Sequence, residues 1–160
     1  MRPLVWLRRI RHRCGYGIHS PFAYNLVTQV IYNDGEYYAY NPLRSRYRLR
    51  GRRAKIARLL FRLANNTQPC EITVPCCLPE AEQAYMQAGC RGAKIAVGDS
   101  PLVRMDNRLT ILLDLPRHKA TFDALKADAA TTVTFDLYDL ALVYHNLPLP
   151  RQDYIVNFEL

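Results

Sequence analysis

The chain has 160 residues, of which 49% are hydrophobic and 22% charged, which fits one globular domain and excludes two large ones. It contains no run of 18 apolar residues, and residues 1–13 are too arginine-rich for a secretory signal, so we expect a cytoplasmic protein without membrane contact. The net charge of +8 is unevenly distributed. Residues 1–62 hold 14 of the 22 Lys and Arg and two of the 14 acids, a net charge of +12, and residues 63–160 have a net charge of −4.

The first predicted element is a helix over residues 20–32. Ser20 can cap this helix by accepting a backbone N–H, and Pro21 suits the first helical position because its missing N–H is not needed there. One apolar stripe then follows the helix: Phe22, Ala23, Leu26, Val27, Val30 and Ile31. The sequence Asn33-Asp34-Gly35 ends it.

The segment before this helix contains two glycines and a histidine, which raises the question of a phosphate-binding loop or an active site. Gly15 and Gly17 favour a turn, and a Gly-x-Gly pair without a preceding strand is a weak phosphate signal. His19 directly precedes the cap, where a hydrogen-bonded structural role is the simpler interpretation. We therefore assign no catalytic residue. The scattered histidines and cysteines have no metal-ligand spacing, so we assign no metal site.

Tyrosines and arginines are mixed in residues 36–53. Arginines can contact phosphates and tyrosines can stack on bases, so this segment is a candidate nucleic-acid surface. The residues that we assign to it are Arg44, Arg46, Tyr47, Arg48, Arg50, Arg52 and Arg53. The alternative is a solvated basic surface, because a strongly positive segment attracts polyanions at low salt whatever its function.

A second amphipathic helix is predicted over residues 52–64. Its inward side chains are expected to be Ile56, Leu59, Leu60 and Leu63, and its outward ones Arg52, Arg53, Lys55, Arg58 and Arg62. A helix of this kind usually lies on a protein surface, with its arginine side chains reaching into solvent.

From about residue 69 the pattern changes to short β runs alternating with helices. We predict strands at 70–74, 93–97 and 108–115, helices at 79–89 and 116–128, a hairpin over 131–146 and a last strand over 153–160. This order predicts an α/β fold. We therefore divide the chain into a basic helical N-terminal extension, residues 1–65, and an α/β sheet domain, residues 66–160.

Both ends of the chain resemble one family. Residues 15–40, GYGIHSPFAYNLVTQVIYNDGEYYAY, look like the N-terminal signature of a class I S-adenosylmethionine-dependent methyltransferase-like family of Bacteroidetes. Residues 133–146 and 151–158 are similar to the closing strands of the same family. The resemblance covers about residues 13–65 and 109–158. It implies a truncated Rossmann-like methyltransferase sheet, with S-adenosylmethionine as the cofactor of an active member.

The middle of the chain departs from the family pattern where the cofactor would bind. Aligned on the helix that follows, the acid of the family's first strand falls at Val74, and its two loop glycines fall at Cys76 and Glu80. Side chains there hinder the close approach of the backbone to a ligand. The remaining cofactor-binding candidates are Asp99, after the second strand, and Asp114, which survives from an acidic pair after a later strand.

Three functions remain open. The first is a degenerate methyltransferase-like protein that lacks cofactor and catalysis and acts as a binding or partner module. The second is an active S-adenosylmethionine-dependent methyltransferase, in which Asp99 holds the ribose and Asp114 lies near the methyl acceptor. The third is a nucleic-acid-binding protein that uses its N-terminal half.

The chain between residues 99 and 109 is short for this family, so part of the sheet is expected to be missing. An apolar strand such as LTILLDL, residues 109–115, would then stand at an open edge. We therefore predict a homodimer that covers it.

Overall fold

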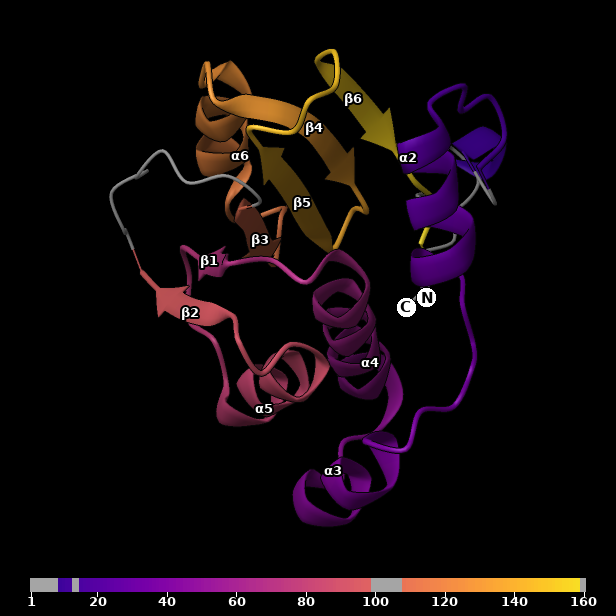
Figure 1. Cartoon of the computed structure of the whole chain (residues 1–160), viewed down its shortest axis with the longest axis vertical. Coiled ribbons are helices and arrows are strands. Elements are labelled where there is room, and N and C mark those ends of the chain that lie inside the picture. Colours follow the sequence, from indigo (N-terminus) through magenta and orange to yellow (C-terminus); the bar gives the residue numbers. More distant parts are fainter. Residues whose placement is uncertain (1–8, 13–14, 99–107, 159–160) are drawn as a thin grey trace. The chain divides into compact units, whose positions relative to one another are not determined.

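The chain folds into a mixed α/β structure, seen here in a computed structural model (Figure 1). The structure describes residues 9–12, 15–98 and 108–158. By its internal contacts the chain divides into two compact units. The helical unit comprises Met1–Gln68, Pro79–Gly92 and Phe158–Leu160, and the sheet unit comprises Pro69–Leu78 and Ala93–Asn157. The predicted division at residue 65 stays a prediction.

The helical unit begins with a short 3-10 turn and the predicted capped helix. Its elements are η1 (Ile10–His12), α2 (Pro21–Asn25), η2 (Leu26–Ile31), α3 (Tyr40–Tyr47), α4 (Gly51–Thr67) and α5 (Glu80–Gly89). The Ser20 hydroxyl accepts the Ala23 N–H at 3.4 Å, and Pro21 occupies the first position, so the predicted helix start is confirmed. Among the described residues, no helix combines the length and the apolar character needed to cross a membrane.

The second half of this helix differs from the prediction, because η2 is a π-helix rather than an α-helix. The Tyr32 N–H donates to the Val27 carbonyl, five residues back, at 3.0 Å. The apolar stripe is confirmed: its buried members are Ala23, Leu26, Val27, Val30 and Ile31. The glycines before the helix both have positive φ, 80° at Gly15 and 76° at Gly17, which a turn into the helix requires.

α4 and α5 pack closely against each other in the helical unit. A Cβ atom at Gly89 would overlap the Phe61 carbonyl oxygen, so the close approach of the two helices requires glycine there. An aromatic cluster accompanies this contact. The rings of Tyr40 and Phe61 meet edge to face with their centroids 5.1 Å apart, and the ring centroid of Tyr85 lies 6.2 Å from that of Tyr40. α3, which ends at Tyr47, is a helix that the sequence pattern did not predict.

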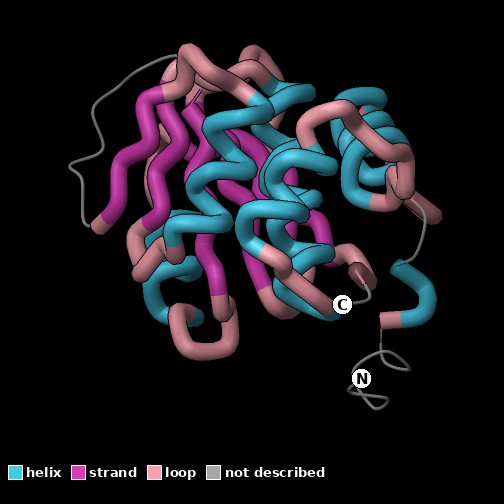
Figure 2. The backbone as a smooth tube through the Cα atoms, turned by 90° about the horizontal axis from the view of Figure 1, so that it is seen from below, coloured by secondary structure: helices cyan, strands magenta, loops and turns pink. Residues whose placement is uncertain are grey.

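The sheet unit contains a six-stranded mixed sheet in the order β2-β1-β3-β5-β4-β6. Its strands are β1 (Glu71–Val74), β2 (Lys94–Val97), β3 (Arg108–Leu113), β4 (Thr131–Asp136), β5 (Leu140–His145) and β6 (Gln152–Ile155). β1 pairs in parallel with β2 and β3, β5 is antiparallel to β3 and β4, and β6 is parallel to β4. Figure 2 shows the strands of the sheet side by side in magenta. The hairpin over residues 131–146, the α/β class and the strands predicted before it are confirmed. The last strand, predicted over residues 153–160, spans Gln152–Ile155, and residues 156–158 are not in a strand.

One face of the sheet combines a polar row with an apolar cluster. Strand register places Glu71, Arg108, His145 and Thr131 side by side across β1, β3, β5 and β4. Helix α6 (Lys119–Ala127) buries Phe122 in a cluster with Leu112, Leu115, Ala141 and Val143. The opposite face carries apolar side chains that are also buried: Ile72, Val74, Leu109, Ile111, Leu142 and Tyr144.

The apolar strand that we expected at an open edge is internal. β3 pairs with β1 on one side and with β5 on the other, because the chain returns as β5 to fill that position. The described sheet ends instead at two four-residue strands, β2 and β6, which expose Val97 and Ile155. The homodimer therefore stays a prediction, and an open edge at β3 no longer supports it.

Candidate functional site

The carboxyl ends of β1 and β3 are the first candidate site. From β1 the chain continues to β2 on one side, and later to β3 on the other side of β1, which makes a topological switch point. Open α/β sheets bind ligands in the crevice outside the strand ends at such a point. Val74 ends β1 and Leu113 ends β3. The residues just beyond Val74 and Leu113 therefore decide what the crevice can hold.

Cys76 joins the two strand ends. Its thiol donates to the Leu113 carbonyl at a sulfur–oxygen distance of 3.7 Å. Burial raises the pKa of the thiol, an effect that the bond to Leu113 partly offsets, so the group stays protonated near neutral pH. The Cys76 side chain thus lies where the family pattern has a glycine. The Val74 side chain is buried and apolar, so it offers no polar group to a ligand.

Asp114 follows β3 directly and has a left-handed conformation, with φ at 53°. Its carboxylate pairs with Arg117, Oδ2 to Nε, at 3.2 Å, and both side chains are exposed. Asp99, the second cofactor-binding candidate, lies outside the described residues. In the described part of this site, Asp114 is therefore the single carboxylate that sequence reasoning predicted, and it is already engaged by a neighbour.

The predicted nucleic-acid surface lies in the helical unit, and several of its arginines already pair with acids. Arg53 forms two hydrogen bonds with the buried Glu82, both at 3.0 Å, and these raise the pKa of the guanidinium. Glu80 accepts from Arg46 at 3.4 Å and from the Tyr47 hydroxyl at 3.1 Å. These carboxylates belong to the first turn of α5, where negative side chains also interact favourably with the helix dipole.

The remaining residues of this surface differ from one another. Arg44 pairs with Glu36 at 3.3 Å. Arg48 and Arg50 are exposed and have no ion pair with another described residue. Arg52 is also exposed on α4. The tyrosines nearby are divided as well, since Tyr40 is buried in the aromatic cluster whereas Tyr38 is fully exposed.

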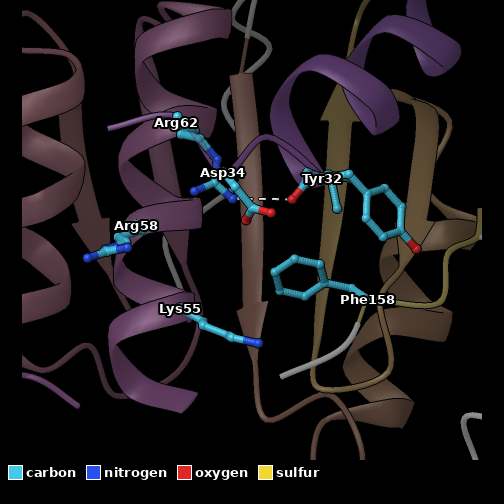
Figure 3. A pocket seen from close by; sticks show the side chains of 8 residues that line it. Tyr32, Asp34, Lys55, Arg58, Arg62 and Phe158 are labelled. Carbon is cyan, nitrogen blue, oxygen red and sulfur yellow. Dashed lines mark hydrogen bonds between the residues drawn. The ribbon is translucent and has the colours of Figure 1, made fainter. Parts of the chain in front are cut away.

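A pocket of about 270 Å³ in the helical unit is a site that sequence reasoning missed (Figure 3). Its lining is Ile31, Tyr32, Asp34, Gly35, Lys55, Arg58, Arg62 and Phe158. We predicted Arg62 on the outer face of its helix, and this prediction is wrong, because the side chain is only 7% exposed. Its guanidinium donates to the carbonyls of Val30 at 2.7 Å and Ile31 at 3.2 Å. The amphipathic pattern of α4 gave no signal of this, since an arginine is polar wherever it lies.

A buried polar network crosses the sheet. Arg108 pairs with Glu71 at 3.1 Å and donates to the Thr73 hydroxyl at 2.7 Å. His145 lies in the same row, with Nε2 2.9 Å from the Thr110 hydroxyl and Nδ1 3.3 Å from Thr131. Burial, and to a lesser extent the Arg108 charge, lower the pKa of His145 to about 4. The imidazole is therefore neutral at physiological pH.

Thr131 indicates which nitrogen of His145 carries the proton. Its hydroxyl donates to the Leu125 carbonyl at 2.6 Å, so it can only accept from the ring. Nδ1 is therefore protonated, and Nε2 accepts from Thr110. Each polar group has a protein partner, which indicates a structural network rather than a catalytic one.

Comparison of the chain with protein-family models, with curated proteins and with solved structures finds no match. The described residues also contain no cluster of three or more His, Cys, Asp or Glu side chains able to hold a metal ion. The functional argument therefore depends on the geometry of the strand ends, the basic surface and the pocket.

Proposed function

We propose that the chain is a methyltransferase-like protein that does not use S-adenosylmethionine and that acts as a binding or partner module. The observation that carries this proposal is the contact of Cys76 with the Leu113 carbonyl, 3.7 Å across the ends of β1 and β3. A cofactor site at a switch point needs an open crevice whose backbone can approach the ligand. Here a side chain spans that crevice.

The order of the strands supports the resemblance on which the proposal depends. In doubly wound sheets of order 3-2-1-4-5-6, strands 2, 1 and 4 are parallel neighbours, and the switch point lies between 1 and 4. β2, β1 and β3 have the same directions and the same order. The antiparallel β5 beyond them supports the expectation that part of a larger sheet has been lost.

The residues at the strand ends do not fit the cofactor. Val74 stands where the family has an acid, and Pro75 removes a backbone donor from the loop. Asp114 pairs with Arg117 and would have to leave it to bind a ligand. A preorganised site avoids such rearrangements, because they cost binding free energy.

The test is a calorimetric titration of the full-length chain with S-adenosylmethionine and S-adenosylhomocysteine, with circular dichroism to show that the protein is folded. We expect no saturable heat, and no rise in melting temperature at millimolar ligand. An active class I methyltransferase, titrated under the same conditions, is the positive control. Micromolar binding that is lost in Asp114→Asn would overturn the proposal and favour the active-enzyme alternative, which detectable methyl transfer would then establish; this variant removes the charge and keeps a residue that tolerates positive φ.

Nucleic-acid binding is the second candidate, and the exposed Arg48 and Arg50, which pair with no described acid, favour it. A specific role requires affinity that depends on the sequence or structure of the nucleic acid at physiological salt. The double variant Arg48→Ala/Arg50→Ala should weaken such binding more than the double variant Arg44→Ala/Arg46→Ala, since Arg44 and Arg46 are already paired with Glu36 and Glu80. Equal weakening in both variants would leave only nonspecific attraction.

A further inference from the structure

The pocket in the helical unit has no role in the proposed function. Three of its cations, Lys55, Arg58 and Arg62, come from α4 at spacings of three and four residues, which places them on one side of that helix. Ile31 and Tyr32, at the end of η2, form another part of the lining. Figure 3 shows Lys55 extending from α4 toward Phe158, whereas Arg58 points the other way.

Arg62 is a buried charge with neutral partners. It is 7% exposed, and its guanidinium donates to the backbone carbonyls of Val30 and Ile31 and also forms a hydrogen bond with the Tyr40 side chain. Within the described chain, no carboxylate lies within ion-pair distance of its guanidinium. A guanidinium has five N–H donors, so these neutral partners leave donors for another acceptor. A buried charge without a counter-ion is costly, and an anionic ligand in the pocket would reduce that cost.

Lys55 is the second cation of the lining that is available to a ligand, because Arg58 is already paired. Lys55 is exposed, and no described carboxylate pairs with it. Arg58 is held by Glu36 at 3.5 Å and by the ring of Tyr40, whose centroid lies 5.2 Å from its Cζ. Asp34 is the one acid among the described lining residues, and its side chain is exposed to solvent.

We propose that this pocket binds a small phosphorylated molecule, with its phosphomonoester group on Arg62 and Lys55. An arginine fork can donate to two phosphate oxygens, and a lysine adds a compact charge. A phosphomonoester carries nearly two negative charges at neutral pH, which the two available cations match. The ring of Phe158 provides an apolar wall for the organic part of the ligand. The volume of about 270 Å³ suits a small ligand, of the size of a mononucleotide or less.

The backbone beside the pocket also points to a ligand. η2 is a π-helix, and its last residue, Ile31, both lines the pocket and accepts a hydrogen bond from Arg62. Single π-helical turns occur often at functional sites, because the wider turn changes the direction of the residues that follow. This proposal does not depend on the state of the strand ends, since every residue of the pocket belongs to the helical unit.

The experiment is a calorimetric titration of the full-length chain with adenosine 5′-monophosphate, with inorganic phosphate and with adenosine. We expect the monophosphate to bind most tightly, phosphate more weakly, and adenosine not detectably. Lys55→Ala should weaken monophosphate binding about tenfold, the loss expected for one charge-assisted contact. Arg62→Lys, which keeps the charge and removes the fork, should weaken it by about the same factor.

Arg91→Ala is the matched control. It removes one positive charge from the same unit, at an exposed position outside the pocket and outside the candidate nucleic-acid surface, and should leave the affinity unchanged. Equal weakening by Arg91→Ala and Lys55→Ala would overturn the proposal, because it would show attraction by net charge alone. The proposal is also overturned if the monophosphate gives no saturable heat, or if phosphate or adenosine binds as tightly as the monophosphate.

Discussion

Among the described residues, each of the two units buries one arginine, and the surroundings of these two side chains differ. In the sheet unit, Arg108 is 2% exposed and pairs with Glu71 at 3.1 Å, while the Thr73 hydroxyl accepts from its guanidinium. In the helical unit, Arg62 is 7% exposed beside a pocket, and its hydrogen-bond partners, two backbone carbonyls and the Tyr40 side chain, are neutral. One charge is neutralised by the protein itself, and the other is not neutralised by any described carboxylate.

This difference separates a structural charge from a binding one. A buried ion pair is satisfied before any ligand arrives, so Arg108 and Glu71 need no external partner. A buried guanidinium that faces open volume keeps part of its hydrogen-bonding capacity for a ligand. The same residue type at similar burial therefore carries different functional meaning in the two units, and four measurements test that distinction.

The largest effect is expected when the ion pair of the sheet unit is broken. Glu71→Ala leaves the Arg108 charge buried without a carboxylate, and should lower the free energy of unfolding by about 3–5 kcal/mol in urea denaturation. The control is the double variant Glu71→Leu/Arg108→Met, which removes both charges and should stay within about 1 kcal/mol of the natural chain. If the single variant is as stable as the double one, Arg108 is not the neutralised charge described here.

A smaller loss is expected at Arg62. Arg62→Met keeps most of the side-chain volume and leaves the carbonyls of Val30 and Ile31 without their donors, which should cost about 1–3 kcal/mol. Water in the pocket can replace part of these bonds, so the value should fall at the low end. Arg58→Met serves as the control on the same helix and should cost less, because its partner Glu36 is exposed. A loss above that of Glu71→Ala would show that Arg62 is the more important structural charge.

His145 should make the sheet unit sensitive to acid. Its pKa is about 4 in the folded chain and 6.5 in an unfolded one, so the unfolded state binds more protons between these values. The stability contributed by the neutral imidazole is thus fully present above pH 6.5 and is lost as the pH falls toward 4. Between pH 7 and 5.5 the loss should be about 1 kcal/mol, measured by urea denaturation at both values.

His145→Gln is the variant that isolates this effect, because glutamine does not titrate. Its stability should change less than that of the natural chain over the same pH interval. A nuclear magnetic resonance titration gives an independent measurement: the His145 ring signals should stay constant down to about pH 5. A ring that titrates near pH 6.5 would contradict the buried network.

The smallest effect on stability is expected at Lys55. This side chain is exposed and pairs with no described acid, so Lys55→Ala should change the free energy of unfolding by less than about 0.5 kcal/mol in urea denaturation. Together with a large loss of monophosphate affinity, this result would identify Lys55 as a binding residue without a structural role. A large destabilisation would instead give Lys55 a structural part, and would make its binding data ambiguous.

Much of the secondary structure was predictable from local patterns. The cap at Ser20 with Pro21, the period of the apolar stripe up to Ile31, and the alternating β runs after residue 69 each involve neighbours in the chain. Elements that depend on packing were harder to predict. α3 is rich in polar residues and has only a weak pattern of apolar positions. η2 has π-helical hydrogen bonds, which span five residues where those of an α-helix span four, and local sequence does not distinguish the two.

The candidate sites were predictable only in part. Asp114 was singled out because the family resemblance aligns it with one member of an acidic pair, and Cys76 because it stands where the same resemblance places a glycine. The pocket was not found, because its residues come from η2, α4 and the segment after β6, which lie far apart in the sequence. The arginine surface was overestimated for the same reason, since Glu80 and Glu82, about 30 residues later, pair with Arg46 and Arg53.

The sequence by itself determined most of the helices and strands, the α/β class and the concentration of positive charge in the first 62 residues. These follow from local periodicity, capping and composition, which require no knowledge of distant partners. Only the tertiary structure decided which charges are neutralised and which remain available. The free energy of a charge depends on its burial and on the groups within a few ångströms, and residues as distant as Glu71 and Arg108, or Val30 and Arg62, become neighbours only when the chain folds.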